Sequence, residues 1–447
     1  MGTTRDIAEF AHKTTFDDFD SALVKHVKNV LLSGLGMTLA GVNTGAGKAV
    51  INYVKECEAP QEAGVLGAGF RTSAEYAALA NGTTSHSTEL EDDIVPDMIY
   101  SVGIFPGVFA LGEKLHVSGK EIIEASIIAW DIAAKLSLPA VKMLLRSSGV
   151  APSFCTIGVA AASAKLLKLG IKETTMAISI SASHTSWGII RQAGTGSHLF
   201  EAGLAGRNGV ASAMLAKHGL TGQPDILESP MGLLHGFTGE AYSIPKLGEP
   251  YRAKFIGIKK YPCCFLEMHI IDGCIELIKA NNISADDVES VQVDVSPVFA
   301  NTIRYHHPKN EEESRFSLPH SIACCFLDKK PWIESYSTER VNQPDVNAFR
   351  NKVKMVVQPE IVDPELILGG ETPISIRLKD GTEYRKMCPK PTDPIIVSDE
   401  EVMDKYMKCS LQVLSKSRAK QVAKTVLSLE KVHDISKLMT LLTFPDK

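Results

Sequence analysis

The sequence predicts a mainly α-helical protein, with a large all-helical domain built from both chain ends and a smaller α+β domain inserted between them. Apolar segments with helical spacing recur through residues 1–258. Between residues 259 and 392 the pattern changes to alternation with a period of two, which is typical of half-buried strands. The helical pattern returns over residues 393–447. Two domains also fit a chain of 447 residues, which exceeds the usual size of a single core.

Helices are expected first in the N-terminal part of the chain. Residues 22–41 predict a buried helix, because valines and leucines recur there at helical spacing and glycines end the run. Residues 121–136 and 158–169 are rich in alanine, isoleucine and leucine and predict further apolar helices. Residues 208–218 repeat the pattern, and Gly219 stops it.

The inserted α+β domain is predicted from strands that alternate with short helices. An Asp380-Gly381 turn indicates a hairpin, because this pair readily adopts the tight turn that joins two antiparallel strands. Prolines near residue 390 mark the end of the domain, and residues 399–442 are again helical. Strands are expected at 291–295, 353–357 and 374–378, and helices at 317–327 and 345–352.

Composition and charge exclude several classes of partner. The chain carries 44% apolar and 22% charged residues, and its net charge of −5 comes without a basic stripe, so neither nucleic acid nor an anionic membrane is expected. No apolar run approaches the ~20 residues of a membrane span, and the N-terminal residues lack a secretory or transit pattern. Nine cysteines without a C-x-x-C motif fit reduced thiols. We therefore expect a cytoplasmic protein.

The most informative segment begins at Asn81-Gly82, where a helix-like apolar run is expected to end. Clustered carboxylates repel one another, so such a segment either faces water as a solvated loop or performs chemistry. Within the cluster, His86 fits a hydrogen-bonding loop residue better than a base. The titratable residues that follow within eight positions are His86, Glu89, Glu91, Asp92 and Asp93.

The order of residues from Asn81 to Glu113, NG…HS.(D/E)..DD…P…S….P..(A/L)LGE, resembles the signature of the MmgE/PrpD family. That family includes 2-methylcitrate dehydratase, cis-aconitate decarboxylase and iminodisuccinate epimerase. The resemblance implies that the inserted domain is a lid, that the protein is a homodimer, and that the active site lies between the domains. It implies no metal and no organic cofactor. Further stretches match in the same order: 152–169, 203–228, 259–269 and 316–323.

The resemblance places five residues at functional positions. Glu89 stands where many relatives have Asp, and Asp93 where Thr is common. His198 replaces a lysine that binds a substrate carboxylate, and supplies a full charge only when protonated. Lys259 is retained at a lysine position, and His320 stands where Tyr often acts as the acid. We expect these five residues to be catalytic, with Lys259 and His198 also binding substrate.

Three further positions depart from the family pattern. Ile99 and Ala151 occupy places where relatives carry histidine, so two imidazoles are missing from the implied site. Cys264 takes the place of a third, frequent histidine, although a buried cysteine is more often a small hydrophobe than a nucleophile. We expect all three residues to line the substrate-binding site without transferring protons.

These residues favour a cofactor-independent enzyme that removes a proton beside a carboxylate of a small organic acid. A lyase of the dehydratase or decarboxylase type is the first expectation, and an epimerase or isomerase of a mono- or dicarboxylate is the alternative. Each lost cationic partner would cost about 1–3 kcal/mol for a desolvated carboxylate, which disfavours a tricarboxylate substrate. The missing histidines leave a third interpretation open, a non-catalytic relative that binds a metabolite.

Overall fold

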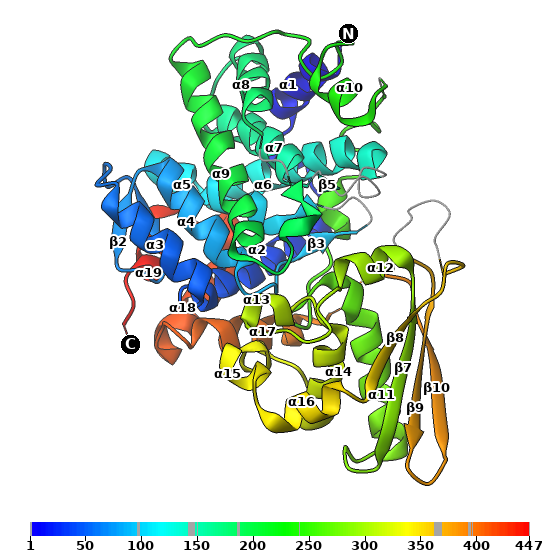
Figure 1. Cartoon of the computed structure of the whole chain (residues 1–447). Helices are drawn as coiled ribbons and strands as arrows, with labels where there is room; N and C mark the ends of the chain where they lie inside the picture. The colour runs from blue at the N-terminus through cyan, green and yellow to red at the C-terminus, as the bar shows by residue number, and fades with distance from the viewer. Residues whose placement is uncertain are drawn as a thin grey trace. The chain divides into compact units, whose positions relative to one another are not determined.

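The protein is mainly α-helical, as the sequence predicts (Figure 1). The computed structural model describes residues 2–95, 99–141, 148–149, 151–185, 188–240, 242–361, 369–391, 395 and 397–446, with backbone alone at 99, 148, 149 and 151. The chain forms two compact units. Unit 1 contains Met1–Ile189, His198–Ile258 and Ile396–Lys447, and unit 2 contains Ile190–Ser197 and Lys259–Ile395.

Unit 1 is a helical body whose core is made of apolar helix faces. The helices predicted at 22–41, 121–136, 158–169 and 208–218 correspond to α2, α6, α7 and α9. Several begin at a serine, threonine or aspartate whose side chain accepts a backbone N–H, as Asp20 does from Leu23 at the start of α2. From the N-terminus the helices are α1 (Thr3–Lys13), α2 (Ser21–Gly41), α3 (Gly45–Glu56), α4 (Ala74–His86), α5 (Phe105–Leu115), α6 (Gly119–Ser137), α7 (Ala151–Leu166), α8 (Ile171–Ser183), α9 (Gly196–Lys217) and α10 (Leu233–Thr238).

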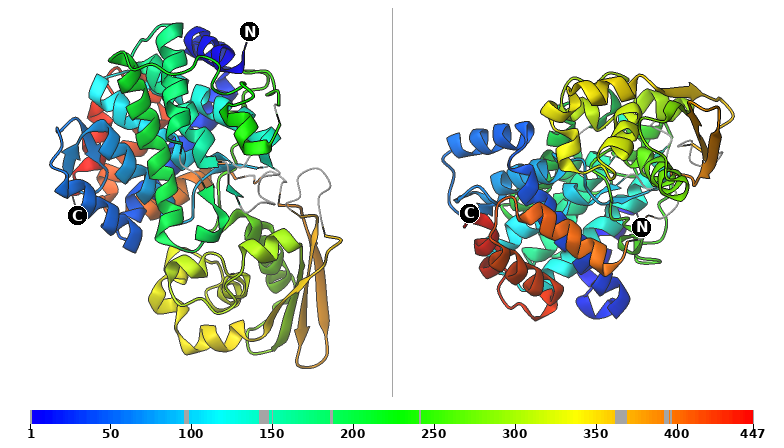
Figure 2. Two further views of the ribbon diagram at one scale, coloured as in Figure 1. Left: turned by 45° about the horizontal axis from the view of Figure 1, so that its top comes forward. Right: turned by 90° about the horizontal axis from the view of Figure 1, so that it is seen from below.

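The C-terminal segment returns to the same helical body. It forms α17 (Asp399–Ser410), α18 (Lys416–Leu427) and α19 (Ser436–Thr443). Helix α17 packs along α2, which joins the two ends of the chain within unit 1 (Figure 2). Gly36 of α2 permits this packing, because a Cβ there would lie 3.2 Å from the backbone of Tyr406.

Unit 2 is an α+β unit built on a four-stranded sheet in the order β10-β9-β7-β8. Strands β9 and β10 form the predicted hairpin, in which Gly381 takes a φ of +89°. Strand β7 pairs antiparallel with β9 and parallel with β8. Helices α11 (Met268–Asn281) and α14 (Leu318–Leu327) pack on the sheet. The strands are β7 (Val288–Val295), β8 (Val353–Val357), β9 (Thr372–Leu378) and β10 (Glu383–Cys388), and the shorter helices are α12 (Pro297–Thr302), α13 (Glu311–Ser314), α15 (Thr338–Val341) and α16 (Pro344–Arg350).

The segment Ile190–Ser197 also belongs to unit 2, which the sequence did not predict. Arg304 donates hydrogen bonds to the carbonyl oxygens of Arg191 (2.8 Å) and Ala193 (2.6 Å). The backbone passes so close to Tyr305 that a Cβ at Gly194, whose φ is +83°, would lie 2.4 Å from the tyrosine ring. These contacts fix the chain immediately before the first turn of α9.

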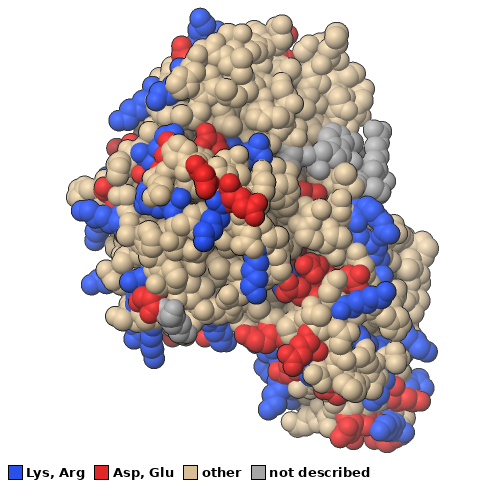
Figure 3. Space-filling view, turned by 60° about the vertical axis from the view of Figure 1, so that its left-hand side comes forward, with Lys and Arg blue, Asp and Glu red and all other residues tan. Residues whose placement is uncertain are grey.

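The surface shows no preference for one sign of charge on the face drawn in Figure 3, where lysines and arginines are interspersed with acidic residues. Across the described residues, none of the helices combines the length and the apolar character needed to cross a membrane.

Helix α4 corrects the sequence prediction for the acidic segment. The helix does not end at Asn81-Gly82 but continues to His86. Both residues make tertiary contacts. The Asn81 side chain accepts a hydrogen bond from the Leu66 N–H and donates one to the Gly64 carbonyl, each at 2.9 Å. Gly82 lies against Gly203 of helix α9. A pattern that indicates a helix end in isolation therefore marks tight packing inside the core.

Candidate functional site

The candidate site of unit 1 is built where α4 and α9 approach each other through glycines. A Cβ at Gly82 would lie 2.7 Å from the Cα of Gly203, and a Cβ at Gly203 would lie 2.3 Å from the carbonyl oxygen of Leu79. Such a close approach requires glycine on both helices. It brings His86, the last residue of α4, next to His198 in the first turn of α9.

The acidic segment after α4 is buried, so its interpretation as a solvated loop is wrong. Glu89, Glu91, Asp92 and Asp93 are each at most 6% exposed. Glu89 takes a φ of +54°, a left-handed conformation that turns the chain directly after the helix. His86 is likewise fully buried and belongs to a helix, so its interpretation as a loop residue is also wrong.

Two anchors hold this segment in place. Lys405 of α17 donates hydrogen bonds to the Oδ1 of Asp92 (2.8 Å) and to the carbonyl oxygen of Leu90 (2.9 Å). Asp93 begins β3 (Asp93–Ile94), which pairs with β4 (Ile99–Tyr100), and its backbone also pairs with Gly257. The buried charge of Asp92 is therefore matched by a buried ammonium group from the far end of the chain.

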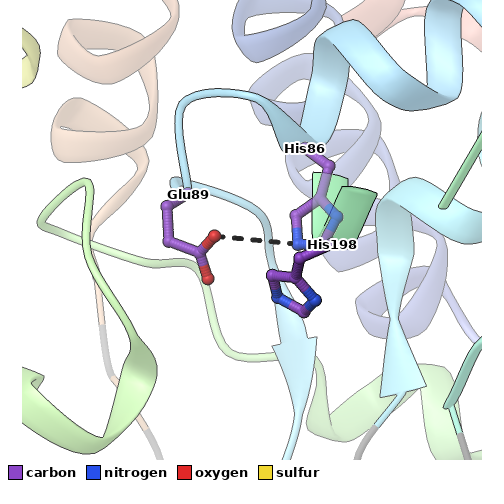
Figure 4. A group of neighbouring side chains, drawn as sticks. All are labelled: His86, Glu89 and His198. Atoms are coloured by element: carbon purple, nitrogen blue, oxygen red, sulfur yellow. Dashed lines mark ion pairs between the residues drawn. The ribbon is translucent and has the colours of Figure 1, made fainter. Parts of the chain in front are cut away.

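His86, Glu89 and His198 form a compact group of proton-transfer side chains (Figure 4). The Nε2 of His86 lies 3.9 Å from the Oε2 of Glu89 and 3.7 Å from the Oε1 of Glu91. The rings of His86 and His198 meet edge to face, with their centroids 4.8 Å apart. Two imidazoles therefore share one buried environment with carboxylates.

Glu201 and Tyr100 complete the surroundings of His198. The Oε2 of Glu201 lies 3.3 Å from the Nδ1 of His198, and the ring of Tyr100 stands perpendicular to the imidazole with a centroid separation of 6.3 Å. Burial by itself lowers the pKa of His198, but the hydrogen bond to Glu201 and the charges of Glu89, Glu201 and Glu91 together raise that pKa above its ordinary value. Burial and the nearby carboxylates raise the pKa of Tyr100 well above the usual range, so its phenol stays protonated.

One trio of side chains has the composition of a metal site. His86, Glu89 and His198 each offer one ligand atom, and these atoms lie within 4.8 Å of one another. Two imidazoles and a carboxylate suit zinc or non-haem iron. Metal–ligand bonds of roughly 2.1 Å span at most about 4.2 Å, so the trio would have to contract to hold one ion. The sequence-based expectation of no metal stays a prediction.

The other predicted site residues with described side chains lie in unit 2. Lys259 is 1% exposed. Burial raises the pKa of the Cys263 thiol well above its ordinary value, and the charge of Lys259 acts in the opposite direction. Cys264 is buried as well, with its backbone N–H bonded to the carbonyl of Arg315 at 3.0 Å. This environment agrees with a small packed side chain.

His320 is a fully buried residue in the first turn of α14. Its Nε2 lies 2.9 Å from the carbonyl oxygen of Ser335, to which it donates. Burial lowers the pKa of His320 to about 4, so the ring is neutral near pH 7. A neutral imidazole whose proton is held by a carbonyl is a weak acid, and the proposed role of His320 in proton transfer stays a prediction.

The predicted site residues with described side chains divide between the two units. Glu89 and Asp93 from the segment after α4 and His198 from α9 lie in unit 1, where Glu89 and His198 belong to one compact group. The side chains of Ile99 and Ala151 lie outside the described part. Sequence reasoning missed Glu201, although its spacing of three residues from His198 was a usable signal for one helix face. It also missed Tyr100 and Lys405, whose positions depend on tertiary folding.

The fold and this group of residues define a helical protein with an inserted α+β unit and a buried cluster of acid–base side chains. The chain belongs to the MmgE/PrpD family: residues 5–244 match the MmgE/PrpD N-terminal domain, and residues 261–431 match the MmgE/PrpD C-terminal domain.

The similarity to characterised relatives extends over nearly the whole chain. The chain is 25% identical to cis-aconitate decarboxylase of Aspergillus terreus, over 100% of this chain and 97% of that protein. It is 24% identical to cis-aconitate decarboxylase of Mus musculus, over 99% of this chain and 93% of that protein. The human enzyme of the same name is also 24% identical, over 99% of this chain and 95% of that protein.

Proposed function

We propose that the protein is an MmgE/PrpD-type enzyme that transfers a proton at the carbon beside a carboxylate of a small organic acid, as a dehydratase or decarboxylase-type lyase. Full-length similarity to relatives named as decarboxylases supports an enzyme of the lyase class. The observation that carries the proton-transfer step is that His198, at a position where the family resemblance implies function, is buried in contact with Glu201 and close to Glu89.

His198 is the proton-transfer residue in this proposal, as the base in an elimination or epimerisation and, when protonated, as the acid in a decarboxylation. In an elimination, its imidazole takes the proton from carbon, the electron pair of the C–H bond forms a C=C bond, and a hydroxyl group on the next carbon leaves as water after protonation. In a decarboxylation, the pair of the broken C–C bond stays on carbon, and the protonated imidazole returns a proton to it. A base whose pKa lies near the working pH serves both directions.

Lys259 is the proposed holder of a substrate carboxylate. Its side chain is 1% exposed, and a buried ammonium group interacts with an anion far more strongly than an exposed one. The substrate should carry fewer carboxylates than cis-aconitate, because His198, Ile99 and Ala151 replace cationic or titratable groups of the relatives. The buried carboxylates of unit 1 add repulsion against further anions.

Epimerisation is the second candidate, and one feature favours it. Besides His198, the buried group contains Glu89 as a second acid–base side chain. If these two act on opposite faces of the carbon, one removes a proton and the other returns one without loss of any group. Homodimer formation and a cytoplasmic location belong to the same proposal, and sedimentation of the purified protein tests the first.

A panel of mono-, di- and tricarboxylic acids in deuterated water tests the function by NMR. We expect deuterium exchange beside a carboxylate with at least one acid, together with loss of water or CO₂. Exchange with inversion and no loss would select the epimerase, and no exchange with any acid would select a metabolite-binding protein.

A matched pair of variants tests the proposed role of Lys259 in binding a substrate carboxylate. Lys259→Ala should abolish turnover with the fold intact. Lys260→Ala, next in sequence but bound to Asp272 at 3.0 Å and partly exposed, should leave turnover nearly unchanged. Full activity of Lys259→Ala would contradict its role.

A further inference from the structure

Glu201 is a buried residue, and each of its two carboxylate oxygens has a hydrogen-bond partner. It lies three residues after His198 on α9, and its Oε2 is 3.3 Å from the Nδ1 of that histidine. Its Oε1 accepts the backbone N–H of Ile189 at 3.3 Å. Glu201 is 7% exposed, so these contacts form away from bulk water. The backbone of Ile189 thus fixes the carboxylate of Glu201, and this carboxylate in turn can fix the orientation of the His198 ring.

We propose that Glu201 is a positioning residue that holds the Nδ1 proton of His198 and leaves the Nε2 of His198 to accept the proton from substrate. The inference rests on the proposed function and deepens it. A carboxylate behind an imidazole fixes its tautomer and stabilises the imidazolium that forms when the ring takes up a proton. The proton moves from carbon to Nε2, and the Nδ1 proton stays between the ring and Glu201.

The groups that face His198 support a base rather than a holder of carboxylates. Among the described residues these are His86 from α4, Glu89 and Glu91 from the segment after α4, Tyr100 from β4, and Glu201 from its own helix. Carboxylates stabilise a protonated ring but repel an anionic substrate group.

The role at this position therefore differs from the one implied for relatives. Where they have a lysine that binds a substrate carboxylate, this chain has a histidine backed by its own carboxylate. Position 198 has changed from binding an anion to accepting a proton.

Nitrogen NMR of histidine-labelled protein tests the pairing without any substrate, so its result is independent of whether the proposed function holds. The His198 signal is identified by its loss in His198→Gln. We expect the tautomer with the proton on Nδ1 in the wild type. In Glu201→Gln the titration midpoint of His198 should fall by about one pH unit, the lower end of the effect of a close opposite charge. A wild-type ring protonated on Nε2, or an unchanged midpoint in Glu201→Gln, would overturn the inference.

Kinetics with an acid that loses water or is epimerised, two reactions in which His198 must take a proton from carbon, gives the second test. The rate should fall as the pH drops through the titration of His198. This acid limb should move to lower pH in Glu201→Gln, because His198 is then a weaker base and is protonated only at lower pH. Glu201→Asp should restore the limb in part. His198→Lys separates the two roles: we expect at least about a 100-fold loss of turnover, since the lysine stays protonated. Retained activity in His198→Lys would show that the position binds an anion instead.

Discussion

Replacing Gly203 by alanine tests whether the contact of α4 with α9 builds the site. The added Cβ would lie 2.3 Å from the carbonyl oxygen of Leu79 and 2.4 Å from the Oγ1 of Thr83. Carbon and oxygen atoms do not approach so closely, so the helices must separate by roughly 1 Å. The Thr83 hydroxyl, which donates to the Leu79 carbonyl at 2.9 Å, would also be displaced.

Overpacking of this kind costs about 1–3 kcal/mol in the free energy of unfolding. It should also weaken turnover, because His86 and His198 lie on the two helices that separate. Urea unfolding followed by circular dichroism measures the first effect, and the turnover of the best substrate measures the second. Gly236→Ala in α10 is the matched control: nothing lies within 4 Å of its added Cβ, so a stabilisation of up to about 1 kcal/mol is expected. A Gly203→Ala variant with wild-type stability and turnover would refute the reasoning.

Two further predictions concern buried titratable groups. Lys405→Met should lower the free energy of unfolding by about 3–5 kcal/mol, because it leaves the carboxylate of Asp92 buried without its ammonium partner. The exposed pair of Lys13 with Glu9 is the comparison, and Lys13→Met should lower the free energy of unfolding far less; equal losses in urea unfolding would contradict the account. His320 keeps a pKa of about 4 when folded, against roughly 6.5 unfolded, so the unfolded chain binds the proton first as pH falls. The free energy of unfolding therefore falls by about 3 kcal/mol in all as the pH drops from 6.5 to 4. A His320→Gln variant should lose stability less steeply over this range, and the same slope in both proteins would refute the assignment.

The sequence predicted those parts of the fold that depend on local patterns. Helix α2 shows its apolar spacing, and the β9–β10 hairpin shows its Asp-Gly turn, because both signals act over a few residues. The end of α4 was predicted wrongly for a physical reason. Gly82 there permits close packing against Gly203, more than a hundred residues away, and a short window of sequence does not contain that partner.

The candidate site was predictable to the extent that the family resemblance aligned its positions. Glu89 and His198 were selected in that way, and both lie in the buried cluster. Burial of the acidic segment was not predictable, because it depends on Lys405 of the C-terminal helix α17. Glu201 was overlooked although its spacing from His198 on one helix face was readable, since an acidic residue on a helix is usually solvated.

Hydrogen exchange at the carbon of a turned-over acid, compared between the wild type and His198→Gln in deuterated water, tests proton abstraction by the buried histidine most directly. We predict that exchange falls by about 10²–10⁴-fold in His198→Gln and stays near the wild-type rate in His218→Gln, whose imidazole is exposed. Exchange at the wild-type rate in a folded His198→Gln protein would contradict the account.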